Sequence, residues 1–218
     1  MKFDLSSALP RITPGRPLVV TDADGVLLCF TGGFERWLAE RGLSLDLTSY
    51  RLEGAIRRMD DKSPILLVET KALVEEYRED LDYLDEVEGA CDALAELARH
   101  ASIVVLSNVN HTQAVARMRN FKALGIDYPL IANDSGGGYL ADKGKAVRAL
   151  AAHARARTFF IDDIPVNLTA VAKDAPEVTL IHLVESEPLR QLLGTGFHAH
   201  CYAKDWVAAK QFILEQLG

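Results

Sequence analysis

The chain has 218 residues, 49% of them hydrophobic, and a formal net charge of −7. This size suits one hydrophobic core with or without a small accessory domain. The acidic charge argues against a nucleic-acid backbone as the main partner, because proteins that bind one usually carry a basic stripe. No apolar run approaches the ~20 residues that span a bilayer, and the N-terminus is not a signal peptide, so no membrane association is expected.

The three cysteines, Cys29, Cys91 and Cys201, are scattered singly. Their spacing matches no zinc site, and free thiols are typical of a reducing compartment. We therefore expect a cytoplasmic protein.

The first predicted core element is a buried strand, Leu18-Val19-Val20-Thr21, that ends in two aspartates, Asp22 and Asp24. Gly25 lets the chain turn away from the sheet. Ligands of an open α/β sheet bind at the carboxyl ends of its strands. Carboxylates this close together indicate a metal site, acid/base chemistry or an ordinary acidic turn.

Residues 30–85 read as a helical insertion directly after this strand. Apolar residues at helical spacing predict helices over 34–41, 50–59 and 65–83, and no alternating strand pattern interrupts them. Aromatic residues within it, Phe34, Trp37 and Tyr77, are expected to fill its interior. We therefore predict a small helical cap at 30–85 and a core formed by 1–29 and 86–218.

The remainder alternates helices and strands, which predicts right-handed crossovers and a parallel sheet. A helix over 89–98 precedes a strand that ends at Ser107-Asn108, and a helix over 112–124 precedes a strand at 129–132. The last pair is a helix that opens at Asp142-Lys143-Gly144-Lys145 and a strand that ends at Asp162-Asp163. The expected fold is a three-layer, Rossmann-like α/β core with an inserted α-helical cap.

Four short motifs follow one another along the chain: Asp-x-Asp, then Ser, then Lys, then Asp-Asp. Each stands at the appropriate end of a predicted element. This order resembles the haloacid dehalogenase-like hydrolase superfamily. The resemblance extends from about Leu18 to Val184. Most members are phosphatases and phosphotransferases that work through an aspartyl-phosphate. It implies that Asp22 is the nucleophile and Asp24 the general acid/base. It also implies that Ser107, with Asn108 beside it, binds the phosphoryl group.

The resemblance further implies a Mg²⁺ site. Asp22, the backbone carbonyl of Asp24 and the side chain of Asp163 are the expected ligands, with Asp162 as a direct or water-mediated helper. Mg²⁺ favours such oxygen donors and commonly keeps substrate phosphate in its shell. Asn167 stands where many relatives have a second acid.

A lysine of the 142–145 stretch is expected to neutralise the phosphoryl group, and two candidates remain open. Lys143 is favoured because it precedes Gly144 and opens the helix. Lys145 is two positions further on and faces elsewhere, because helical neighbours two apart do not share a face. Solvated lysines at the helix start are the alternative reading, although the positive end of a helix disfavours cations.

These features predict a Mg²⁺-dependent phosphomonoester hydrolase that acts on a small phosphorylated metabolite. A phosphotransferase or phosphomutase, a phospho-accepting receiver module and a non-catalytic binding protein are the alternatives. The acid at Asp24 argues against carbon–halogen cleavage, because dehalogenases of the superfamily lack it. His111 is a candidate for substrate contact. The Gly-rich stretch 135–139 is read as a turn, with contact between its backbone amides and phosphate as the alternative. The sequence does not identify the substrate.

Overall fold

A computed structural model describes residues 2–47, 52, 54–79, 84–134, 142–193 and 198–218. The strands are β1 (Lys2–Phe3), β2 (Leu18–Thr21), β3 (Leu43–Leu45), β4 (Ile56–Arg58), β5 (Ser102–Ser107), β6 (Leu130–Asp134), β7 (Thr158–Asp162), β8 (Thr179–Leu183) and β9 (Cys201–Ala203). The helices are η1 (Leu9–Arg11), α1 (Phe30–Ala39), α2 (Leu67–Glu79), α3 (Ala90–Leu97), α4 (His111–Ala123), α5 (Gly144–Ala154), α6 (Pro165–Asp174), α7 (Glu187–Leu193) and α8 (Trp206–Leu217).

The main sheet has the strand order β1-β6-β5-β2-β7-β8-β9, and the pairs from β6 to β9 are all parallel. This confirms the predicted parallel α/β core. The edge strand β1 pairs antiparallel with β6 and was not foreseen. Every residue of β2, β5 and β7 is buried, as expected for central strands covered on both faces. In the register, Thr21 lies opposite Val105 on one side and Ile161 on the other.

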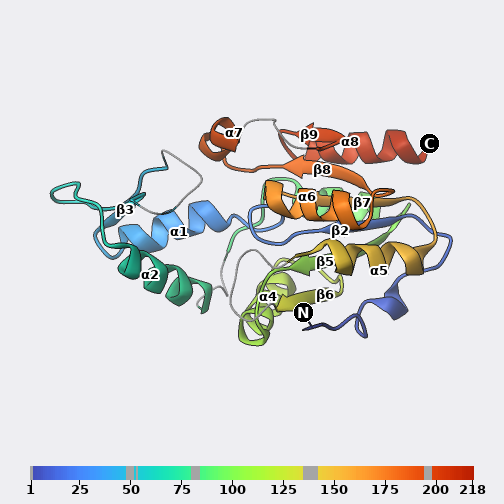
Figure 1. Ribbon diagram of the computed structural model, residues 1–218, viewed down its shortest axis with the longest axis horizontal. Helices are drawn as coiled ribbons and strands as arrows, with labels where there is room; N and C mark the ends of the chain where they lie inside the picture. The colour runs from blue at the N-terminus through green and yellow to red at the C-terminus, as the bar shows by residue number, and fades with distance from the viewer. Residues whose placement is uncertain (1, 48–51, 53, 80–83, 135–141, 194–197) are drawn as a thin grey trace.

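Successive residues of β2 point to opposite faces of the sheet and divide the core into two layers. Val19 belongs to the apolar cluster that contains Leu94 of α3 and Ile213 of α8. Val20 belongs to the cluster that contains Leu150 of α5 and Leu168 of α6. The sheet is therefore covered by helices on both faces, and Figure 1 shows α5 and α6 in front of it.

The described residues of 30–79, here called the projecting part, extend beyond one end of the sheet, where Figure 1 shows α1, α2 and β3. The helix expected over 50–59 is wrong in its described part, because Ile56–Arg58 forms β4 and pairs antiparallel with β3. Ile56 is fully buried opposite Leu45, so that tertiary packing overrides the local helical pattern. Arg57 Nε also lies 3.1 Å from a carboxylate oxygen of Asp46.

Aromatic side chains fill the interior of this projecting part, as expected. The rings of Phe34 and Tyr77 lie 4.9 Å apart, and those of Trp37 and Tyr77 lie 5.6 Å apart. All three residues are buried. The Tyr77 hydroxyl donates to the backbone carbonyl of Phe30 at 3.1 Å, so α2 is tied to the start of α1.

The chain leaves and re-enters the core through two backbone segments that lie side by side. The amide of Cys29 donates to the carbonyl of Asp85 at 2.9 Å, and the amide of Val87 donates to the carbonyl of Leu27 at 2.8 Å. These bonds tie the exit and the return of the insertion to each other.

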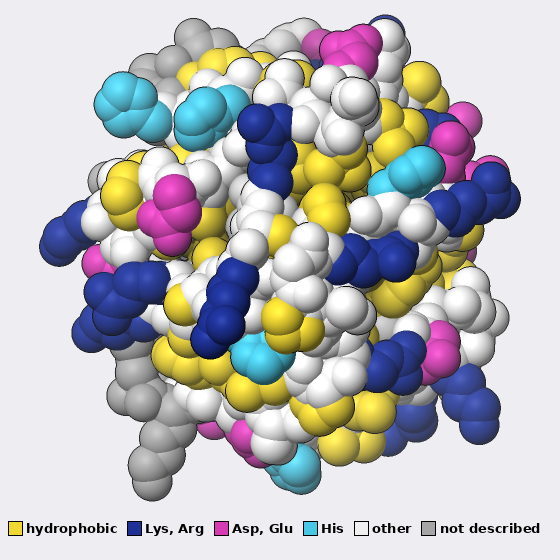
Figure 2. Space-filling view, turned by 90° about the vertical axis from the view of Figure 1, so that its right-hand side faces the viewer, with side chains coloured by type: hydrophobic (Ala, Val, Ile, Leu, Met, Phe, Trp, Pro, Cys, Tyr) yellow, Lys and Arg dark blue, Asp and Glu magenta, His cyan; other side chains and the backbone are white. Residues whose placement is uncertain are grey.

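Figure 2 shows the end of the molecule remote from α1 and α2, where basic and acidic side chains are scattered among hydrophobic ones. Within the part of the chain that the structure describes, no helix has the length and apolarity required to cross a bilayer.

Candidate active site

The carboxyl ends of the three central strands bring most of the predicted residues together. β2 leads into Asp22 and Asp24, β5 ends at Ser107, and β7 ends at Asp162. Because β2 is hydrogen-bonded to both β5 and β7, these ends are adjacent. Gly25 has φ +77°, and a Cβ at this position would lie 2.7 Å from Asp163 Oδ2. The turn after Asp24 therefore requires glycine.

Lys143 bridges two of the strand ends. Its Nζ lies 2.8 Å from Asp22 Oδ1 and 2.8 Å from Asp162 Oδ2, and the residue is fully buried at the start of α5. Lys145 is exposed. Of the two candidate lysines, only Lys143 reaches the aspartates.

Burial and charge act against each other within this bridge. Burial alone would lower the pKa of Lys143, but the charges of Asp162 and Asp22 outweigh it and raise that pKa above its ordinary value. Burial raises the pKa of Asp22 to about 7, although Lys143 opposes the shift. Both the Lys143 ammonium and the Ala23 amide bind the same oxygen of Asp22, Oδ1. Lys143 therefore remains a cation beside this carboxylate.

Asp162 is a fully buried carboxylate whose two oxygens already have donors. Its Oδ1 accepts from the amide of Ile164 at 2.8 Å and from Asn167 Nδ2 at 2.9 Å, and its Oδ2 accepts from Lys143. Asn167, at the expected place of a second acid, is a hydrogen-bond donor that holds Asp162. The geometry makes Asp162 a support for Lys143.

Asp163 differs from Asp162 because its Oδ1 is buried and, within the described residues, has no hydrogen-bond partner. One ligand atom each from Asp22, Asp162 and Asp163 lies within 4.8 Å of the others. Burial, helped by the neighbouring charges of Asp162 and Asp22, raises the pKa of Asp163 well above its usual range. An unpartnered carboxylate oxygen in an all-oxygen cluster fits a hard divalent cation such as Mg²⁺.

Ser107 ends β5 and Asn108 follows it, next to the strand that leads into Asp22 and Asp24. Ser107 is buried, and both residues line the same cavity as Asp22 and Asp24. The amide oxygen of Asn108 accepts from Asn133 Nδ2 at 2.8 Å. Arg78 of α2 donates to the backbone carbonyl of Asn108 at 2.6 Å, so the projecting part contacts the strand end directly. Sequence reasoning did not identify this arginine.

A second arginine that sequence reasoning missed is Arg117 of α4. It is fully buried, and its guanidinium pairs with Asp24 Oδ1. The buried residues of this helix, Gln113, Ala116, Arg117, Asn120 and Phe121, follow a helical spacing. Arg117 could have been identified from the sequence as a charged residue on the buried face of a predicted helix, because a buried charge requires a partner.

One further candidate is not brought into the site, and another falls outside the described residues. His111 begins α4, is exposed and is absent from the described cavity lining. The Gly-rich stretch 135–139 lies outside the described residues.

Comparison with solved structures identifies the fold that carries these residues. A haloacid dehalogenase (HAD) superfamily hydrolase of subfamily IA from Geobacter sulfurreducens is 17% identical, with a TM-score of 0.59, over 95% of this chain and 100% of the other. The chain has the haloacid dehalogenase-like fold. CbbY from Rhodobacter sphaeroides, solved with phosphate, shares the HAD-like fold with 17% identity and a TM-score of 0.54, over 88% of this chain and 95% of CbbY.

An L-2-haloacid dehalogenase also shares the HAD-like fold, with 12% identity and a TM-score of 0.58, over 91% of this chain and 100% of the other. No family model and no curated protein sequence matches this chain. Because the HAD-like fold carries more than one chemistry, the activity has to be argued from the residues at the strand ends.

Proposed function

We propose that this protein is a Mg²⁺-dependent phosphomonoester hydrolase that forms an aspartyl-phosphate on Asp22. The observation that carries the proposal is the position of Lys143 Nζ, 2.8 Å from both Asp22 and Asp162, in a cluster with Asp163, whose Oδ1 has no partner among the described residues. This combination of a buried cation, a carboxylate and an open ligand position suits transfer of a dianionic group.

In the first step, Asp22 attacks phosphorus. Its Oδ1 is held by Lys143 and by the Ala23 amide, so we assign the attack to Oδ2. A bond forms between Oδ2 and phosphorus as the bond from phosphorus to the leaving oxygen breaks. Ser107 and Asn108 hold the phosphoryl oxygens, and Asp24 gives its proton to the leaving alkoxide.

In the second step, Asp24 takes a proton from water, and the water oxygen attacks phosphorus. The bond from phosphorus to Asp22 breaks, which releases phosphate and restores the carboxylate. The side chains of Asp22 and Asp163 and the backbone carbonyl of Asp24 would hold Mg²⁺. When bound, Mg²⁺ supplies positive charge that offsets the repulsion between a carboxylate and a phosphate dianion.

The test is a panel of phosphomonoesters with and without Mg²⁺, with phosphate release as the readout. We expect turnover that EDTA abolishes and Mg²⁺ restores. Alcohols added as acceptors separate hydrolysis from transfer, because a transferase gives a new phosphomonoester instead of free phosphate. Halide release from 2-chloropropionate, without any phosphate release from the panel, would contradict the proposal.

Two variants assign the roles of the aspartates. Asp22→Asn should lower kcat by several orders of magnitude with the fold retained, because an amide is a poor nucleophile. A loss below about tenfold, ~1.4 kcal/mol on the barrier, would contradict the assignment. Asp24→Asn should impair an alkyl phosphate far more than an activated aryl phosphate, because only the former needs a proton on its leaving oxygen.

A further inference from the structure

The cavity at the strand ends has a volume of about 430 Å³, which is in the range of small-molecule sites. Its floor is polar and consists of the strand-end residues described above. Its walls come from the projecting part and from α7, and they are mainly apolar: Phe30, Phe34, Leu45, Leu47, Leu52 and Leu189. A bound molecule therefore meets charge at one end and hydrocarbon along the rest.

Hydrogen-bonding side chains are few on the described part of these walls. Among the described lining residues outside the strand-end loops and α6, only Thr31 and Arg78 have polar side chains. The guanidinium of Arg78 is already bound to the Asn108 carbonyl at 2.6 Å, and 8% of its side chain is exposed. Against the described walls, a polyhydroxylated substrate would bury hydroxyl groups without enough partners, which is unfavourable.

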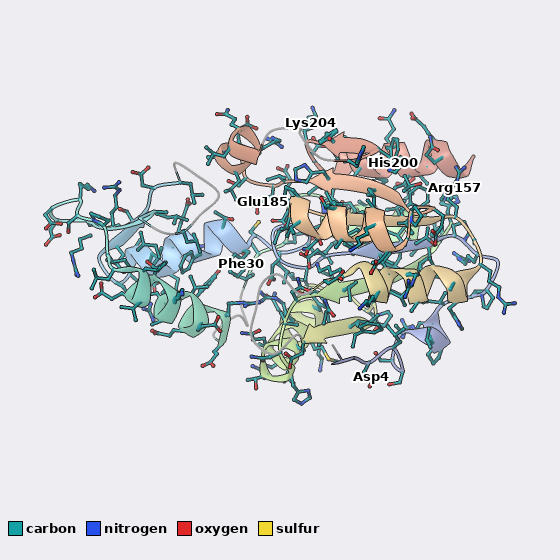
Figure 3. The ribbon with its side chains drawn as sticks, in the orientation of Figure 1. Asp4, Phe30, Arg157, Glu185, His200 and Lys204 are labelled. Atoms are coloured by element: carbon teal, nitrogen blue, oxygen red, sulfur yellow. The ribbon has the colours of Figure 1, made fainter. Side chains whose placement is uncertain are left out.

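The aromatic part of the wall is held in place by its neighbours. Phe30 packs edge-on against Tyr77 with ring centroids 5.2 Å apart, and its ring lies 6.4 Å from that of Phe34. Figure 3 labels Phe30 at the junction between the projecting part and the sheet. Because Tyr77 also bonds the Phe30 backbone, the ring has a defined position against which an apolar group can pack.

We propose that the substrate is a phosphomonoester of an apolar alcohol, with an alkyl or aryl body that occupies the walls while the phosphate occupies the floor. This inference rests on the proposed function, because it assumes a phosphate at the strand ends. The cavity then binds phosphomonoesters of hydrocarbon alcohols in preference to those of polyols, and the wall leucines and Phe30 account for this selectivity.

The test compares two phosphonates that resist hydrolysis and have equal numbers of non-hydrogen atoms, hexylphosphonate and 3,4-dihydroxybutylphosphonate. Their affinities are measured calorimetrically with Mg²⁺ present. We expect hexylphosphonate to bind about tenfold to a hundredfold more tightly, the discrimination typical of an apolar pocket. Equal affinities, tighter binding of the diol, or binding of neither compound would overturn the inference.

Matched variants on α7 locate the selectivity. Leu189 lines the cavity, whereas Leu192 on the same helix is 39% exposed. Leu189→Gln should weaken hexylphosphonate binding by about fivefold or more and change the diol by less than twofold, because only the alkyl body needs an apolar wall. Leu192→Gln should change neither affinity. Equal effects of both variants would overturn the assignment to the wall.

Turnover separates this inference from the proposed function. If hexylphosphonate binds selectively but no phosphomonoester is hydrolysed, the apolar pocket is supported and the hydrolase proposal fails. If phosphomonoesters are hydrolysed but sugar and polyol phosphates have the higher kcat/KM, the hydrolase proposal is supported and the apolar substrate class fails.

Discussion

The guanidinium of Arg117 pairs with one carboxylate oxygen, Oδ1, of Asp24. Arg117 is fully buried in α4, whereas 20% of the Asp24 side chain is exposed and lines the cavity. The pair joins the helix that follows Ser107 to the turn that follows Asp22. The orientation of the proposed proton donor is therefore set by a residue from a different part of the chain.

Replacement of Arg117 by methionine, Arg117→Met, should lower kcat by more than tenfold and change KM less, because Asp24 loses its orientation while the proposed phosphate contacts remain. The variant should also lose about 1–3 kcal/mol of unfolding free energy. This loss is smaller than that expected on breaking a fully buried ion pair, because Asp24 reaches solvent. Steady-state kinetics and urea unfolding measure both effects. Lys122→Met, at an exposed position of the same helix, is the control.

The double variant Arg117→Met/Asp24→Asn tests whether the stability loss comes from an unpaired carboxylate. It should be more stable than Arg117→Met alone, because the lone charge is gone. Simple addition of the two single losses would argue that Arg117 acts through packing only.

The lysine bridge gives a prediction with a built-in control. Lys143→Met should abolish measurable turnover and cost about 3–5 kcal/mol of unfolding free energy, because two buried carboxylates lose their shared cation. Lys145→Met, at an exposed position two residues away, should leave kcat within twofold and stability within about 0.5 kcal/mol. Greater damage from Lys145→Met would show that the active-site lysine is misassigned.

Asp162, at the end of β7, and Asp163, directly after it, should respond differently when the carboxylate is replaced by an amide. Asp163→Asn should raise the Mg²⁺ concentration for half-maximal activity by tenfold or more and leave the fold stable, because Oδ1 of Asp163 has no described partner to lose. Asp162→Asn should lower stability by about 2 kcal/mol or more, because Lys143 loses a buried partner. Calorimetric Mg²⁺ titration and urea unfolding measure the two effects separately. Equal Mg²⁺ affinities of Asp163→Asn and the parent would remove Asp163 from the proposed metal site.

The thiols should react slowly in the folded protein. Burial raises the pKa of Cys29 to about 12, and it raises the pKa of Cys91 to about 12 as well. A higher pKa means less thiolate at a given pH, and the thiolate is the reactive form. Iodoacetamide at pH 8 should therefore modify both residues at least tenfold more slowly in native protein than in concentrated guanidinium chloride. Mass spectrometry of timed digests follows each site, and similar rates in both conditions would contradict this expectation.

The positions that sequence reasoning predicted well are those fixed by strand ends. Asp22, Ser107 and Asp162 each follow a continuous apolar run, and parallel strands place their carboxyl ends on one edge. The partners of those residues were harder to predict, because Arg117 and Arg78 reach the site from helices whose packing is not a local property. The β3–β4 pair was missed for the same reason, since Ile56 is a strand residue only because Leu45 lies opposite.

The paired backbone segments at Cys29 and Val87 have a consequence for how this architecture can vary. Backbone hydrogen bonds join Cys29 to Asp85 and Val87 to Leu27, so the core itself holds the two ends of the 30–85 segment next to each other. The entropy cost of closing a loop between fixed ends grows only slowly, by about 0.6 kcal/mol for each doubling of its length. Insertions or deletions between these ends should therefore alter the walls of the cavity with little effect on the sheet, so substrate preference can diverge while the residues at the strand ends stay in place.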